Sequence, residues 1–199
     1  NISMQSIYSC GDIEKLRFLH CNNQLKGYVG DVFNKVRRIE VLPNGTVILS
    51  TTQGLITYRD SYTYPDRIRF YVSRHTADEN SLYTSEVMQT KVAPDGKLYV
   101  VTLGGGLQYA DAGNLLQDDL RFKPVEDKDG NAATQIYSNG TIQSLLTDNQ
   151  GDLWVIGESR IACIGKSGLK EYGADEIGGV NISEGMPSHS AKADRIVIP

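Results

Sequence analysis

The sequence predicts an all-β protein: a β-propeller segment of about four blades, each a four-stranded antiparallel sheet, within a larger propeller. Three stretches support this prediction because they repeat one pattern. They are IEVLPNGTVILSTTQGLITY at 39–58, TKVAPDGKLYVVTLGGGLQY at 90–109 and SLLTDNQGDLWVIGESRIACI at 144–164. Each copy has an apolar alternating run, a polar turn closing on glycine, an apolar strand, a short loop and another strand. A strand-only repeat of about 50 residues is typical of propellers.

The first complete unit is predicted to contain four strands, near 36–42, 46–51, 55–58 and 67–72. Asn44-Gly45 joins the first two strands, because both residues tolerate the positive φ of a tight hairpin turn. The second and third units repeat this order. Their predicted strands lie near 86–93, 97–102, 106–110 and 120–125, and near 141–147, 153–157, 160–164 and 169–172.

The second strand of each unit is apolar at consecutive positions, as in Val47-Ile48-Leu49 and Leu153-Trp154-Val155-Ile156. Such a strand must be covered on both of its faces. A blade that lies between two neighbouring blades meets this condition. An open sandwich would more often show polar residues alternating with apolar ones.

These units also predict the domain organisation. A partial blade occupies 1–35, with strands near 4–9, 15–20 and 25–29; complete blades occupy 36–85, 86–140 and 141–190; and 191–199 is the first strand of the next or closing blade. Two arrangements remain open. In one, the terminal strand completes the first blade of a four-bladed ring. The other is an excerpt of a larger propeller, which we favour because such repeats usually occur in longer arrays.

Composition argues against several classes of function. The chain has 24 acidic and 20 basic residues and a net charge of −4, so it has no general attraction to nucleic acid. No apolar run approaches the roughly 20 residues of a membrane-spanning helix, so we expect no direct membrane insertion of this segment. The first residues also lack the basic and apolar regions of a signal peptide.

Histidines and cysteines are scattered, so no metal or cofactor is expected. They are His20, His75 and His189, and Cys10, Cys21 and Cys163. A Cys10–Cys21 bridge and buried free thiols are both open. The sequence around Ser159 also misses the nucleophile elbow, which needs a glycine two residues after the serine.

The third repeat, TDNQGDLWVIGESRIACI, resembles the two-component regulator propeller repeat through the pattern D-x-x-G-x-L-W-V-x-G. The copies PNGTVILSTTQGLITY and PDGKLYVVTLGGGLQY fit its turn glycine, apolar strand and terminal Tyr. The resemblance covers roughly residues 36–172. It implies the periplasmic sensor region of a hybrid two-component system sensor histidine kinase of Bacteroidetes. The usual signals of that family are breakdown products of polysaccharides, and its kinase lies in a part of the protein beyond the propellers.

A ligand site is predicted on the propeller face that holds the connections between blades and the loops between second and third strands. Aromatic residues there can stack on sugar rings while polar groups orient hydroxyls. The third repeat breaks the pattern on this face with a charged loop at 158–160. The predicted ligand-binding residues are Tyr83, Tyr137, Glu158, Ser159, Arg160 and His189. In the alternative interpretation, the tyrosines pack between blades and the charges are solvated surface.

The expected function is therefore a non-catalytic, periplasmic sensor module of a membrane-anchored signalling protein. A small molecule or oligosaccharide is the expected ligand. Adjacent propeller or β domains of the parent chain are expected partners, and a homodimer is a further candidate. Two alternatives remain open: a propeller lyase or hydrolase with acid and base groups at the central channel, and a structural repeat module for protein interaction.

Overall fold

The computed structural model describes residues 5–7, 18–20, 35–59, 68–74, 76–126, 142–157, 160–173, 175–176, 188–190 and 195–197. The described residues form strands and turns, with one short 3₁₀ helix at Ala112–Asn114. None of the helical residues among them builds a segment long and apolar enough to cross a bilayer. The prediction of an all-β protein is confirmed.

Three four-stranded antiparallel sheets form the blades, and each uses strands that follow one another in the sequence. The first blade contains β3 (Val36–Val41), β4 (Val47–Thr51), β5 (Gly54–Tyr58) and β6 (Arg69–Tyr71). The second contains β7 (Val87–Val92), β8 (Lys97–Thr102), β9 (Gly106–Asp111) and β10 (Lys123–Pro124). The third contains β11 (Ile142–Thr147), β12 (Leu153–Gly157), β13 (Ile161–Gly165) and β14 (Gly168–Tyr172). The predicted four-stranded antiparallel blades are confirmed.

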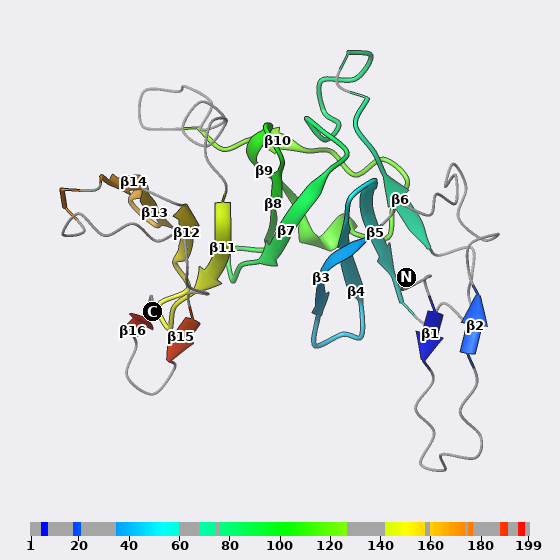
Figure 1. The fold of residues 1–199 in the computed structure, drawn as a ribbon, viewed down its shortest axis with the longest axis horizontal. Helices are drawn as coiled ribbons and strands as arrows, with labels where there is room; N and C mark the ends of the chain where they lie inside the picture. The colour runs from blue at the N-terminus through cyan, green and yellow to red at the C-terminus, as the bar shows by residue number, and fades with distance from the viewer. Residues whose placement is uncertain are drawn as a thin grey trace, which may run out of the picture.

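The blades spread as a fan, with their first strands on the inner side and their fourth strands on the outer side (Figure 1). We call β3, β7 and β11 the inner strands. β7 contacts both β3 and β11, so the blades meet along these strands. The hairpins that follow the inner strands lie at one end of the blades, which we call the hairpin end. The turns between second and third strands lie at the opposite end, the loop end.

The three repeat glycines close the hairpins as predicted. Gly45, Gly96 and Gly151 have φ of 82°, 82° and 88°, in the left-handed region that favours glycine. In the third blade, Asp148 also holds the turn: its Oδ1 accepts hydrogen bonds from the Gln150 and Asp152 amides, at 2.9 Å each. Its Oδ2 accepts one from the Trp154 indole at 2.8 Å. This arrangement gives the Asp and Trp of the repeat a structural role.

The same irregularity occurs near the start of every inner strand. The pairing between first and second strands shifts by one residue at equivalent places in the three blades. Such a β-bulge leaves one residue unpaired and re-aims its side chain. The unpaired residues are Arg37 in β3, Met88 in β7 and Gln143 in β11.

Two apolar seams join the three blades. The seam between the first and second blades includes Ile48, Leu98 and Phe122, and the next seam includes Tyr99, Leu145 and Val155. The connection 112–122 of the second blade contributes to the first seam through Leu115, Leu120 and Phe122. In the third blade the corresponding connection is a two-residue turn at 166–167. The seams are therefore filled differently.

The connection 112–122 is tied to the first blade by polar contacts. The Tyr71 hydroxyl donates its single proton to the Gln117 carbonyl at 2.6 Å and lies 3.1 Å from the Leu115 carbonyl. Arg69 forms an ion pair with Asp118 at 2.7 Å. Because this connection packs into the seam, β10 is shorter than the predicted strand at 120–125. Pro124, which has no N–H, is tolerated because β10 is the outermost strand of its sheet.

Short strand pairs lie at the two ends of the fan. β1 (Gln5–Ile7) pairs with β2 (Phe18–His20), and β15 (Ser188–Ser190) pairs with β16 (Arg195–Val197). The predicted third strand near 25–29 lies outside the described residues. β15 contacts β11, and β16 falls within the predicted terminal strand segment 191–199. β15 itself was not predicted, because the polar sequence Ser188-His189-Ser190 carries no apolar strand pattern. The division of the chain into blades stays a prediction.

Candidate functional site

A groove of about 610 Å³ lies at the loop end of the inner strands. All three blades contribute to it, and most of its walls come from the residues around the β-bulges. Its volume falls in the range of roughly 300–1,000 Å³ that is usual for small-molecule sites. We call it the axial groove. It is lined by Lys35, Val36, Arg37, Arg38, Thr52, Met88, Gln89 and Ile142.

The lining of the axial groove is positively charged. Among the described residues that line it, Lys35, Arg37 and Arg38 carry positive charges and the others are neutral. The charge of the groove is thus opposite in sign to the net charge of −4 of the chain. Arg37 forms an ion pair with Glu86, which precedes β7, and both side chains are 33% exposed. Arg38 is exposed, and its Nη1 donates to the Arg37 carbonyl at 3.3 Å.

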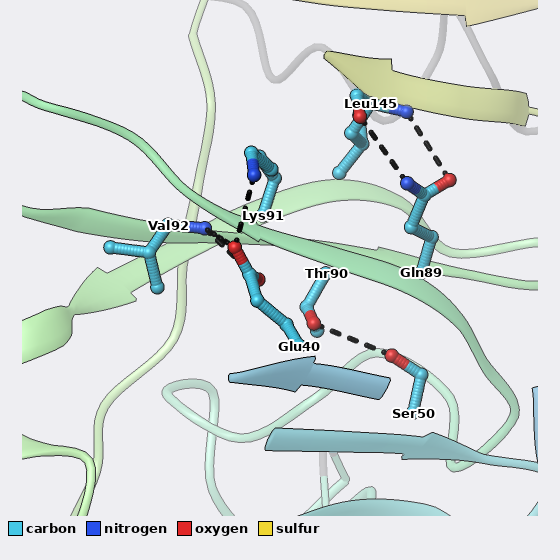
Figure 2. Close-up of polar contacts among 7 residues, drawn as sticks. All are labelled: Glu40, Ser50, Gln89, Thr90, Lys91, Val92 and Leu145. Carbon is cyan, nitrogen blue, oxygen red and sulfur yellow. Dashed lines mark hydrogen bonds and ion pairs between the residues drawn. The ribbon is translucent and has the colours of Figure 1, made fainter. Parts of the chain in front are cut away.

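Two hydrogen bonds of Gln89 connect the second and third blades beside this groove (Figure 2). The Gln89 Nε2 donates to the Leu145 carbonyl at 3.3 Å, and its Oε1 accepts from the Leu145 amide at 3.2 Å. The side-chain amide therefore pairs with the free edge of β11 as a neighbouring strand would. Such pairing satisfies backbone groups that an edge strand otherwise leaves open.

Glu40 forms an equivalent connection between the first and second blades (Figure 2). Its carboxylate accepts from the Val92 amide at 3.2 Å and forms an ion pair with Lys91, also at 3.2 Å. The Glu40 side chain is only 16% exposed, so these partners offset the cost of burying its charge. Ser50 and Thr90 add a hydroxyl–hydroxyl contact of 3.4 Å between the same blades.

The predicted ligand-binding residues that are described lie at the loop end but do not line the axial groove. Tyr83 is half-buried in the connection before β7. Its amide donates to Gln108 Oε1 at 2.9 Å, and its carbonyl accepts from Ser73 at 2.9 Å. Burial raises the pKa of its hydroxyl. Arg160 is exposed immediately before β13. The structure thus places these two residues on different blades.

The remaining predicted site residues are not located by the structure. Tyr137, Glu158 and Ser159 lie outside the described residues, and only the backbone of His189 is described, in β15. Cys10 and Cys21 also lie outside the described residues, so the predicted alternatives for them are not tested. Cys163 is a half-buried free thiol whose pKa is raised to about 11 by burial, with Asp152 and Asp148 adding to the shift. No group of three potential metal ligands occurs among the described side chains.

A second groove, of about 670 Å³, separates the second and third blades. Tyr99 and Tyr109 lie on one wall, and Ile164 and Leu169 on the other. Its charges are mixed, since Lys97, Lys123 and Lys166 share it with Asp95, Glu126 and Asp152. Lys97 is already engaged, with its ammonium 4.7 Å from the Tyr109 ring centre and 3.5 Å from Asp95. The axial groove, with charge of one sign, is the better candidate for specific recognition.

Sequence reasoning overlooked the axial groove because its charged residues lie at the start of an ordinary strand. A signal was present. The first inner strand begins K-V-R-R at 35–38, whereas the equivalent positions of the second blade read E-V-M-Q at 86–89. Basic residues replace neutral or acidic ones only in the first of these two copies. A charge difference between repeats marks a position that the shared fold does not require.

The fan of four-stranded antiparallel blades defines the chain as a β-propeller segment. It is similar to the solved structure of YCF48 bound to D1 peptide, with a TM-score of 0.50, 13% identity, and coverage of 85% of this chain and 47% of that chain. It is also similar to PorZ, a surface component of the type-IX secretion system of Porphyromonas gingivalis, with a TM-score of 0.48, 15% identity, and coverage of 66% and 20%.

A third similar structure is the extracellular domain of a hybrid two component system from B. thetaiotaomicron. The TM-score is 0.45 at 16% identity, and the match covers 78% of this chain and 17% of that chain. The chain thus spans less than half the length of each of these three proteins. At such identities the likeness concerns the fold. No family model and no curated protein sequence matches the chain.

Proposed function

We propose that this chain is a non-catalytic, ligand-binding propeller module from the extracytoplasmic sensor region of a two-component signalling protein. The axial groove is the observation that carries the binding role, because three blades build it from their inner strands. The resemblance of residues 36–172 to the two-component regulator propeller repeat supports the signalling context. Periplasmic location follows from the same resemblance, and an oligosaccharide is the ligand class that it favours.

Binding in the axial groove offers a physical route for a signal. Gln89 lines the groove and also holds the backbone of Leu145 in the next blade. A ligand that contacts the groove therefore touches residues on which the contact between blades depends. Adjacent β domains of the parent chain would sense a change in this contact, and a kinase outside the chain would transmit it.

A calorimetric titration of the full chain with a panel of oligosaccharides tests this proposal. We expect one class to bind, and Met88→Trp to abolish binding because the larger ring fills the groove. Tyr83→Ala and Arg160→Ala test the loop residues predicted from sequence. If these two variants lose binding while Met88→Trp retains it, the ligand site lies on the loops. If the folded chain binds no member of the panel, an oligosaccharide-sensing role is wrong.

A further inference from the structure

We propose that the axial groove binds an anionic ligand, one that carries carboxylate or sulfate groups, through Lys35 and Arg38. This inference rests on the proposed binding role of the groove and specifies the chemistry of its ligand. The charge of the lining is the first reason, since three cations and no carboxylate among the described residues face a space of about 610 Å³. Grouped cations with few counter-charges create a positive potential that attracts anions.

The second reason is how the cations are engaged. Arg37 is held by Glu86, so one of the three positive charges is already neutralised. Within the described part of the chain, no carboxylate forms an ion pair with the side chain of Lys35 or Arg38. Both residues are exposed. Their charges are therefore available to a ligand that enters the groove.

The third reason comes from comparing the blades. Arg38 follows the bulge of β3 as Gln89 follows the bulge of β7. Gln89 uses its side chain to join the next blade, whereas the hydrogen bond that the Arg38 side chain makes within the described residues goes to the carbonyl of Arg37. Lys35 and Glu86 occupy equivalent positions in the first and second blades. The Lys35 carbonyl accepts from the Thr52 amide just after β4, and the Glu86 carbonyl accepts from the Leu103 amide just after β8. The fold therefore uses the backbone at these positions in both blades, but it does not require a positively charged side chain there.

A substitution of Glu86 tests the proposal, because it should increase the affinity for an anion and not decrease it. Its carboxylate pairs with Arg37 and would compete with an anionic ligand for the same guanidinium. Glu86→Gln should therefore tighten binding of an anion, because it frees Arg37. Lys35→Gln and Arg38→Gln should weaken it. A variant that damages the fold would lower affinity in every case, so a gain on Glu86→Gln cannot come from misfolding.

The experiment uses calorimetry on the full chain with a matched pair of ligands, trigalacturonate and its fully methyl-esterified form. We expect the acid to bind at least tenfold more tightly than the neutral ester. Arg38→Gln should cost about tenfold in affinity for the acid, the equivalent of about 1.4 kcal/mol. Lys166→Gln is the control, since it removes the same charge at the hairpin end and should change affinity by less than about twofold.

Further ligands separate the possible sources of the anion. A sulfated disaccharide tests sulfate on a sugar, and inorganic sulfate tests a free anion. Preferential binding of the disaccharide assigns the site to an acidic sugar, and equal binding assigns it to a small anion. In both cases the affinity should fall with salt, because the Debye length shortens from about 30 Å at 0.01 M to 3 Å at 1 M.

The failures of the two proposals can be told apart. If the methyl ester binds as tightly as the acid, or if Arg38→Gln and Lys35→Gln leave affinity unchanged, the anionic ligand is wrong while the binding role stands. If a neutral oligosaccharide binds and Met88→Trp prevents this, the groove is a binding site but its ligand is not an anion. If the folded wild-type chain binds neither acidic nor neutral probes, both proposals fail.

Discussion

Replacing Asp148 by asparagine tests how the hairpin of the third blade is held. In the wild type, the carboxylate accepts two backbone hydrogen bonds and one from the Trp154 indole. Asparagine keeps an acceptor for the backbone but presents an NH₂ group to the indole, which then loses its partner. Losing one hydrogen bond to a half-buried donor costs about 1–2 kcal/mol. Alanine removes all three bonds and should cost about 2–4 kcal/mol.

Trp154 makes this change directly measurable, because it is the single tryptophan of the chain. Urea denaturation followed by its fluorescence should show a lower midpoint for Asp148→Asn. In a domain of this size, 1–2 kcal/mol corresponds to a drop of about 3–6 °C in the melting temperature. Asp119→Asn is the control, because Asp119 is exposed and the same charge change there should cost less than about 0.5 kcal/mol.

The lowered pKa of Asp148 fixes the pH range in which its carboxylate stabilises the fold. Burial alone would raise the pKa of Asp148, but the hydrogen bonds from Trp154 and from nearby backbone amides outweigh it and lower the pKa below its usual 3.8. The folded-state pKa is thus lower than the unfolded-state pKa. The carboxylate therefore stabilises the fold fully above pH 3.8, and this contribution is lost as the pH falls through the lowered value. Equal midpoints for wild type and Asp148→Asn at pH 7 would refute the reasoning.

Three further substitutions test other contacts by urea denaturation. Gln89→Ala should cost about 1–3 kcal/mol, because two backbone groups of Leu145 lose their partners; unchanged stability would mean that water replaces the amide. Gly54→Ala should cost more than Gly45→Ala. A Cβ at Gly54 would lie 2.5 Å from a backbone oxygen, whereas one at Gly45 has nothing within 4 Å; equal costs would contradict this. Tyr71→Phe should cost about 1–2 kcal/mol and speed hydrogen exchange in 112–122, because the hydroxyl anchors that connection.

The strands could be read from the sequence because the hairpin glycines fix their ends. The predicted strand at 97–102 coincides with β8, which starts directly after Gly96. Prediction was poorest where a segment packs across two blades. Leu120 and Phe122 suggested the start of a strand, but they fill the seam with the first blade. That role depends on the neighbouring blade and leaves no local pattern.

The axial groove was overlooked for a related reason, although the K-V-R-R run at 35–38 gave a local signal. The lining residues of β3, β7 and β11 lie about 50 residues apart along the chain, and only the packing of the inner strands brings them together. The bulge at Arg37 cannot be seen in a run of alternating residues either. Tyr83 was chosen as an aromatic residue on the loop face and Arg160 because its loop breaks the repeat, and their part in binding remains a prediction.

The different filling of the two seams has a consequence for folding. The connection 112–122 interlocks the first two blades through Tyr71 and Arg69, whereas the corresponding connection of the third blade is the short turn at 166–167. The first two blades should therefore form one cooperative unit, and the third should open at a lower free energy. Blade arrays are usually viewed as equal copies added one after another. In this chain the first two blades are held together by specific contacts, and the third blade is attached to them more weakly.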